Sequence, residues 1–133
     1  MKILLTGANG YIGLRLLPQL IALGHEVVCA VRNKDRFKVI KELRDKIQVV
    51  EIDFLKDPVT PDLIKDIDVA YYLIHSMTAS TKDFDDKESL SARNFNIIVS
   101  NTRVKQVIFL SGIVNEEKLS RHLQSRKKVE DIL

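Results

Sequence analysis

Five short runs of consecutive apolar residues, rich in valine and isoleucine, recur along the chain. Runs of this length that are apolar at adjacent positions are typical of strands buried on both faces of a sheet. The sequence therefore predicts five strands with polar or mixed segments between them. The predicted strands are Ile3–Leu5, Val27–Val31, Ile47–Ile52, Val69–Ile74 and Val107–Leu110.

The segments between these runs repeat their apolar residues every three or four positions, which is the spacing of an amphipathic helix. Gly24 is suited to the position just after the first helix. Thr60 and Pro61 are suited to the N-cap and the first position of the third helix. The predicted helices are Tyr11–Leu23, Lys34–Arg44, Pro61–Ile67, Asp85–Thr102 and Leu119–Leu133.

Regular alternation of strand and helix predicts an α/β protein with a doubly wound parallel sheet, covered by helices on both sides. Right-handed crossovers, together with a glycine-rich turn after the first strand, predict the strand order 3-2-1-4-5. We expect residues 1–133 to form one domain whose sheet stops before a sixth strand. A dinucleotide-binding sheet usually has that strand, so we expect the chain to be a fragment of a longer protein.

The turn between the first strand and the first helix is the most informative segment, because glycine occupies every third position. Gly7 suits the tight turn that leaves the strand, and Gly10 lets a pyrophosphate approach the backbone closely. Gly13 lets the helix pack closely against the sheet. The unpaired N–H groups and the dipole at the start of that helix favour an anion. The position between strand and helix favours a nucleotide site over the alternative, an ordinary glycine-rich turn. The residues predicted to hold the cofactor here are Gly7, Ala8, Asn9, Gly10, Tyr11, Ile12 and Gly13.

Composition narrows the classes of partner. The chain has 133 residues, of which 45% are hydrophobic, and its net charge of +3 comes from basic residues scattered among acidic ones. Only 6% of the residues are aromatic, so we expect no stacking surface for nucleic acid. Cys29 is the single cysteine and lies in an apolar run, which excludes a disulfide scaffold and a cysteine metal site. No apolar run reaches membrane-spanning length and no secretory leader precedes the first strand, so we expect a cytoplasmic protein without a membrane partner.

Polar residues at the ends of the second and third strands bear on the choice of cofactor. Arg32 follows the second strand, where an acidic residue grips the ribose of NAD and a basic one accommodates the 2′-phosphate of NADP. Arg32 therefore favours NADP, with NAD as the alternative cofactor; the other interpretation is a solvated arginine paired with Asp35. Asp53 and Phe54 follow the third strand and are suited to the adenine amino group and ring. A carboxylate that merely closes a turn explains Asp53 equally well.

Two further candidates follow the fourth and fifth strands. His75 lies after the fourth strand, on the side expected for the nicotinamide, although a polar residue ending a strand explains it too. Ser111 ends the fifth strand, where a hydroxyl can orient a substrate carbonyl or simply cap the backbone.

Together these segments resemble the short-chain dehydrogenase/reductase superfamily. The similarity is greatest to its atypical branch of NAD(P)-binding proteins, which includes NmrA-like regulators and relatives of a complex I accessory subunit. It runs through nearly all of this chain and through the N-terminal half of a usual member. The segments that carry it are Thr6–Gly13, Arg32, Asp53, Asn94–Phe95 and Val104–Gly112.

The chain departs from that family where catalytic members carry Tyr-x-x-x-Lys. The matching stretch here places His122 at the tyrosine position and Arg126 at the lysine position. Arg126 is suited to holding ribose but does not exchange protons at neutral pH, whereas a histidine does. The resemblance therefore implies a cofactor-binding domain without the usual catalytic pair, in a sensing or regulatory role.

Two other functions stay open. One is an NADP-dependent oxidoreductase, or an epimerase or dehydratase acting on sugar nucleotides, whose substrate region is missing from this chain. In that enzyme Ser111, His122 and Arg126 are the candidate catalytic residues. The other is a nucleotide-binding module that forms homo-oligomers through an exposed sheet edge.

Overall fold

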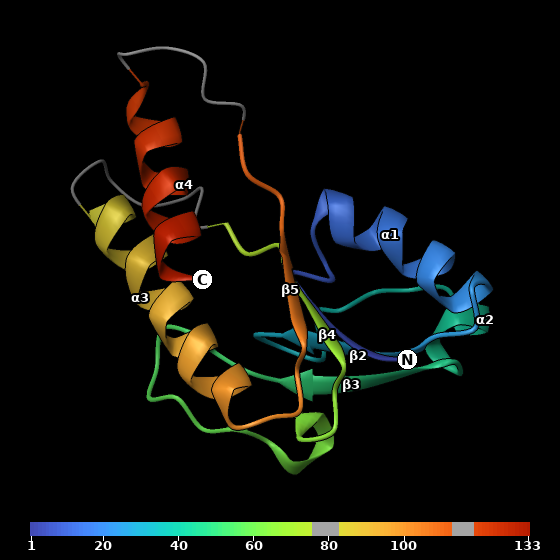
Figure 1. Ribbon diagram of the computed structural model, residues 1–133. Helices are drawn as coiled ribbons and strands as arrows, with labels where there is room; N and C mark the ends of the chain where they lie inside the picture. The colour runs from blue at the N-terminus through green and yellow to red at the C-terminus, as the bar shows by residue number, and fades with distance from the viewer. Residues whose placement is uncertain (76–82, 113–118) are drawn as a thin grey trace.

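Five parallel strands form the sheet at the centre of the computed structural model, which describes residues 1–75, 83–112 and 119–133 (Figure 1). The sheet order is β3-β2-β1-β4-β5, which confirms the predicted class and strand order. Each predicted strand overlaps an observed one, with ends that differ by at most two residues. The strands are β1 (Lys2–Thr6), β2 (Glu26–Val31), β3 (Ile47–Glu51), β4 (Val69–Tyr72) and β5 (Gln106–Phe109).

Helices cover the two faces of the sheet. α1 (Tyr11–Ala22) lies on one side, and α3 (Asp83–Ser100) and α4 (Arg121–Ile132) lie together on the other (Figure 1). Successive side chains of a strand point to opposite faces, so Leu4 joins the core under α3 while Leu5 joins the core under α1. This two-sided burial is why the strands are apolar at adjacent positions. Within the described residues, no helix is long and apolar enough to cross a membrane.

α1 ends as the sequence predicts. Gly24 follows the helix with a φ of 78°, a left-handed conformation that glycine adopts without strain. Its N–H donates to the carbonyl of Ile21 at 3.0 Å, and the N–H of His25 donates to the carbonyl of Leu20 at 3.1 Å. These two bonds satisfy carbonyl groups that the last turn of a helix leaves unpaired.

The prediction of a helix over Lys34–Arg44 is wrong for most of its length, because α2 covers only Lys41–Arg44. Asn33 explains the difference. Its Oδ1 accepts hydrogen bonds from the backbone N–H groups of Asp35 at 2.9 Å and Arg36 at 3.1 Å. A side chain that binds its own following backbone in this way stabilises a turn in competition with a helix.

The predicted helix Pro61–Ile67 is also shorter than expected, since the structure has only a 3-10 helix, η1 (Asp62–Ile64). Pro61, not Thr60, occupies the N-cap position. The Thr60 hydroxyl instead donates to the carbonyl of Ile98 in α3 at 3.1 Å. The threonine therefore ties this segment to α3 and does not cap the helix that follows it.

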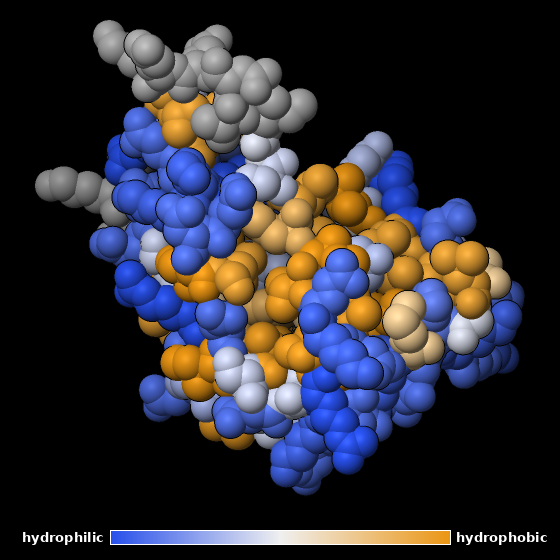
Figure 2. Space-filling view, in the orientation of Figure 1, coloured by the Kyte–Doolittle hydropathy of each residue, from blue (hydrophilic) through white to orange (hydrophobic). Residues whose placement is uncertain are grey.

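β5 lies at one edge of the sheet and pairs only with β4 among the described residues. Apolar side chains gather on the face between α1 and the α3–α4 pair, where β5 runs (Figure 2). Leu110, just after β5, is 51% exposed. Within the described residues β5 is therefore an edge strand, followed by an exposed apolar side chain.

Asn94 fastens α3 to the loop that follows β3. Its Nδ2 donates to the carbonyl of Phe54 at 2.8 Å and to that of Lys56 at 2.7 Å. Asn94 is buried, and the Phe54 and Phe95 rings pack 5.9 Å apart beside it. These contacts fix the position of α3 relative to the ends of the strands.

We predict that Asn94→Ala lowers the free energy of unfolding by about 1–3 kcal/mol, because it removes the donor for the buried carbonyl of Phe54 and for the partly buried carbonyl of Lys56. Urea denaturation measures the change. Asn101→Ala is the matched control, because its Nδ2 donates to Ile97 at an exposed helix end. The control should change the free energy by about 0.5 kcal/mol or less. Equal losses in the two variants would show that Asn94 does not fasten the loop.

Candidate functional site

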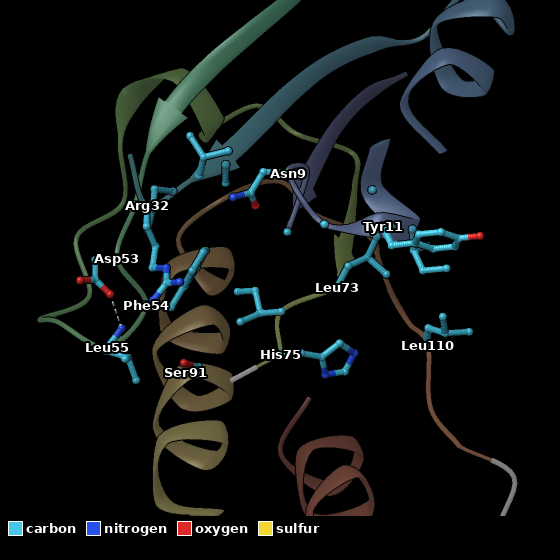
Figure 3. A pocket seen from close by; sticks show the side chains of 18 of the residues that line it. Asn9, Tyr11, Arg32, Asp53, Phe54, Leu55, Leu73, His75, Ser91 and Leu110 are labelled. Atoms are coloured by element: carbon cyan, nitrogen blue, oxygen red, sulfur yellow. Dashed lines mark hydrogen bonds between the residues drawn. The ribbon is translucent and has the colours of Figure 1, made fainter. Parts of the chain in front are cut away.

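A cavity of about 440 Å³ opens at the carboxyl ends of the strands (Figure 3). Its walls come from the glycine turn, the ends of β2, β3 and β4, one face of α3, and the residue after β5. β1 and β4 are neighbours in the sheet, and the strand order reverses between them. Ligands of open α/β sheets bind in the crevice at such a switch point.

The cavity gathers nearly all the residues predicted to hold the cofactor. Ala8 is the exception, since it is fully buried and does not line the cavity. The predicted residues that line it are Gly7, Asn9, Gly10, Tyr11, Ile12, Gly13, Arg32, Asp53, Phe54 and His75.

The glycine turn packs against its surroundings without room for side chains. Gly7 has a φ of 63°, and a Cβ on it would lie 2.5 Å from the carbonyl oxygen of Leu73, just after β4. A Cβ on Gly13 would overlap the carbonyl oxygen of Gly7 and the Cα of Ala8. The close contact of Gly13 is therefore with the turn itself, and not with the sheet as the sequence analysis expected.

Thr6 ties this turn to the end of β4. Its buried hydroxyl donates to the carbonyl of Tyr71 at 2.8 Å and accepts from the N–H of Leu73 at 3.1 Å. The hydroxyl thereby continues the β1–β4 pairing beyond the last paired residues, Leu5 and Tyr71. Sequence reasoning gave Thr6 no role of its own, although a polar residue at the end of a fully buried strand is a usable signal.

The N-terminus of α1 faces the cavity with backbone N–H groups that no side chain caps. Gly10 is the N-cap and makes no side-chain cap, and the first turn carries no acidic residue. The N–H groups of the first turn, at Tyr11, Ile12 and Gly13, have no partner within the helix. Around a Cβ built on Gly10, the nearest atom is the carbonyl oxygen of Gly7 at 3.2 Å. The space in front of the helix is thus suited to a phosphate.

Arg32 and the loop after β3 form one end of the cavity. The Arg32 side chain extends from the end of β2 toward Asp53 and Phe54 (Figure 3). No ion pair is recorded for Arg32 in the described part of the chain, so the pairing with Asp35 is not observed there. Asp53 closes a turn, with Oδ1 accepting from the N–H of Leu55 at 3.1 Å and Oδ2 lying 3.7 Å from Lys56.

His75 lies at the other end, near α4. The Nη1 of Arg126 is 2.7 Å from the imidazole nitrogens of His75, and its Nη2 donates to the carbonyl of Leu110. Partial burial of the ring, followed by the positive charge of Arg126 and an electrostatic interaction with His122, lowers the pKa of His75 to about 4. The ring is therefore neutral at pH 7, and one of its nitrogens is an acceptor for the guanidinium.

The three candidate catalytic residues do not converge on one point. Arg126 is buried and lies over the Phe109 ring at 5.0 Å, whereas His122 is exposed on the first turn of α4. Ser111 donates to Glu130 Oε2 at 3.2 Å and lines a separate small hollow between β5 and α4. Leu110, the residue before Ser111, lines the main cavity instead.

Several residues that line the cavity were missed by the sequence reasoning. Lys87 and Ser91 come from α3 and stand four positions apart, so they share one face of the helix. The helix itself was predicted, but its rotation toward the strand ends depends on contacts distant in sequence. The other missed residues are Ala30, Val31, Ile52, Leu55, Leu73, Ile74 and Leu110.

The comparisons with known proteins agree with this geometry. The chain belongs to the NAD(P)H-binding family, whose model matches residues 7–132. An uncharacterized protein of Saccharomyces cerevisiae is 40% identical over 57 residues, which are 43% of this chain and 19% of that protein. The match to the family confirms the expectation that the glycine turn belongs to an NAD(P)-binding domain.

Solved structures show the same fold. A nucleoside-diphosphate-sugar epimerase from Staphylococcus aureus aligns with a TM-score of 0.79 and 22% identity, over 99% of this chain and 46% of its own. Gre2 from Candida albicans, in complex with NADPH, aligns with a TM-score of 0.71 and 14% identity, over 84% of this chain and 37% of its own. A dTDP-glucose 4,6-dehydratase from Bacillus anthracis, in complex with NAD, aligns with a TM-score of 0.73 and 17% identity, over 99% of this chain and 49% of its own. The chain therefore spans less than half the length of each of these proteins.

We predict that Gly7→Ala lowers the free energy of unfolding by about 3 kcal/mol or more, because strain at positive φ adds to the clash with Leu73. Gly24→Ala is the matched control, since Gly24 also has a positive φ but no atom lies within 4 Å of its built Cβ. That variant should lose only about 1–2 kcal/mol. Urea denaturation of both proteins gives the difference in the free energy of unfolding. Equal losses would show that the contact between Gly7 and Leu73 does not exclude a side chain at Gly7.

We also predict that the His75 ring titrates near pH 4 in the folded protein, as measured by NMR of the imidazole protons. The pKa in the unfolded chain is about 6.5, so the unfolded state takes up its proton first as the pH falls. His75 therefore makes the folded state lose stability between about pH 6.5 and pH 4, and His75→Gln should reduce that loss. A titration midpoint near 6.5 would contradict the contact with Arg126.

Proposed function

We propose that this domain binds NADP(H), with the diphosphate at the start of α1 and the adenosine half between Arg32 and the loop after β3. The observation that carries the proposal is the bare N-terminus of α1, which faces a cavity of about 440 Å³ at the switch point of the sheet. His75 and Leu110 lie at the other end, which is left for the nicotinamide half.

The charges around the cavity support NADP over NAD. Arg32 lines the cavity, and its guanidinium matches the geometry of a phosphate. Among the described residues, Asp53 is the one acidic residue that lines the cavity, and its carboxylate already contacts Leu55 and Lys56. Glu51, at the end of β3, accepts from the N–H of Lys34 at 3.1 Å and does not line the cavity.

Two of the candidate catalytic residues already have partners in the described part of the chain, which supports a role without proton transfer. The guanidinium of Arg126 does not exchange protons at neutral pH, and it is already engaged with Leu110 and His75. Ser111 is engaged with Glu130 outside the cavity. We therefore propose a cofactor-sensing or regulatory role, in which the bound dinucleotide is the signal and hydride transfer is absent.

Calorimetric titration of the chain with NADPH and NADH tests the proposal, together with an absorbance assay for oxidation of bound NADPH by a panel of carbonyl compounds. We expect tighter binding of NADPH and no turnover. Oxidation of NADPH that is lost in His122→Phe would favour the alternative of an NADP-dependent oxidoreductase. A stable dimer that binds neither dinucleotide would favour the oligomerisation module.

We predict that Arg32→Asp weakens NADPH about 10–100-fold and changes NADH much less, because it removes a charged hydrogen bond to the 2′-phosphate. Arg36→Asp is the matched control, since it alters the net charge equally but Arg36 is exposed and does not line the cavity. An unchanged ratio of the two dissociation constants in Arg32→Asp would refute the choice of NADP.

A further inference from the structure

Ser91 stands out among the residues that line the cavity, because its hydroxyl forms no hydrogen bond with the described part of the chain. The residue is 2% exposed, and within residues 1–75, 83–112 and 119–133 no hydrogen bond is recorded for its Oγ. Serine hydroxyls in helices usually bind a carbonyl of the preceding turn. Ser100 of the same helix does so, donating to Asn96 at 2.6 Å. The Ser91 Oγ is not one of the fully buried unpartnered atoms of the described residues, which are Tyr72 Oη and Asp85 Oδ1, so it is open to the cavity that Ser91 lines. A hydroxyl that faces a cavity without a protein partner calls for a specific explanation.

The position of Ser91 supplies that explanation. Ser91 lines the cavity on the same side of α3 as Lys87. Asn94, three residues further along α3, is bonded to the carbonyls of Phe54 and Lys56. Ser91 therefore lies beside the loop that follows β3, and Figure 3 shows it near Leu55 and Phe54 and away from His75. This is the end of the cavity that also holds Arg32.

We propose that Ser91 is a specificity-determining residue whose hydroxyl forms a hydrogen bond with the adenosine half of the dinucleotide. The inference rests on the proposed function, since it requires the adenosine half to occupy the end of the cavity near Arg32. A serine hydroxyl both donates and accepts, so it matches an adenine edge, where ring nitrogens alternate with an amino group. The ligand would supply the hydrogen-bond partner that the Ser91 hydroxyl lacks in the described part of the chain.

The test compares Ser91→Ala with wild type by calorimetry, using NADPH and adenosine 2′,5′-bisphosphate as probes. The bisphosphate carries the adenosine half and lacks the nicotinamide half. We expect Ser91→Ala to weaken both ligands by the same factor, about 5–10-fold, the effect of one hydrogen bond. Ser89→Ala is the matched control on the same helix, because Ser89 does not line the cavity. Its affinities should stay within about twofold of wild type.

Thermal unfolding without ligand separates this role from a structural one. If the hydroxyl has no protein partner, its removal leaves the Tm of the ligand-free protein unchanged or higher. A lower Tm would show that Ser91 has a structural partner and would overturn the inference.

The other outcomes are equally decisive. Wild-type affinity of Ser91→Ala for NADPH would overturn the inference and leave the proposed function intact. Weaker NADPH binding with an unchanged affinity for the bisphosphate would place Ser91 at the nicotinamide half and also overturn it. A wild-type protein that binds neither dinucleotide would refute the proposed function, and this inference with it.

Discussion

The close approach of the turn after β1 to the end of β4 is the constraint on which the site depends. Gly7 has no Cβ, so its backbone can lie against the carbonyl of Leu73, and Thr6 bonds the two strand ends through its hydroxyl. Gly13 then lets α1 begin directly above the turn. Together these contacts fix where the helix starts and which way its free N–H groups point.

That constraint determines how the rest of the cavity is divided. Once the start of α1 is fixed at the switch point of the sheet, the residues after β2 and β3 form one end and those after β4 and β5 form the other. Arg32 gives the first end a cation with no ion pair in the described part of the chain. At the second end Arg126 binds His75 and Leu110. Under the proposed function, the end with Arg32 takes the adenosine half of the dinucleotide and the end with His75 and Leu110 takes the nicotinamide half.

The sequence predicts those parts of the structure whose signals are local. Buried strands are recognised from consecutive apolar residues, and the glycine turn from the spacing of its three glycines. The helix expected over Lys34–Arg44 failed because one side chain, Asn33, redirects the backbone into a turn. The sequence does not predict that Ser91 and Lys87 line the cavity. Their position depends on the hydrogen bonds of Asn94 to a loop 38 to 40 residues earlier in the chain. Residue contacts at that separation leave no periodic trace in a single sequence.

Amide NMR gives the most direct test of the claim that the start of α1 binds a diphosphate. Spectra of the ¹⁵N-labelled protein would be recorded with ADP, with adenosine and with NADPH. ADP and NADPH should shift the amide signals of Tyr11, Ile12 and Gly13, because these N–H groups would donate to phosphate oxygens, while adenosine should leave them in place. NADPH binding that moves other amides and leaves those three unchanged would contradict the claim.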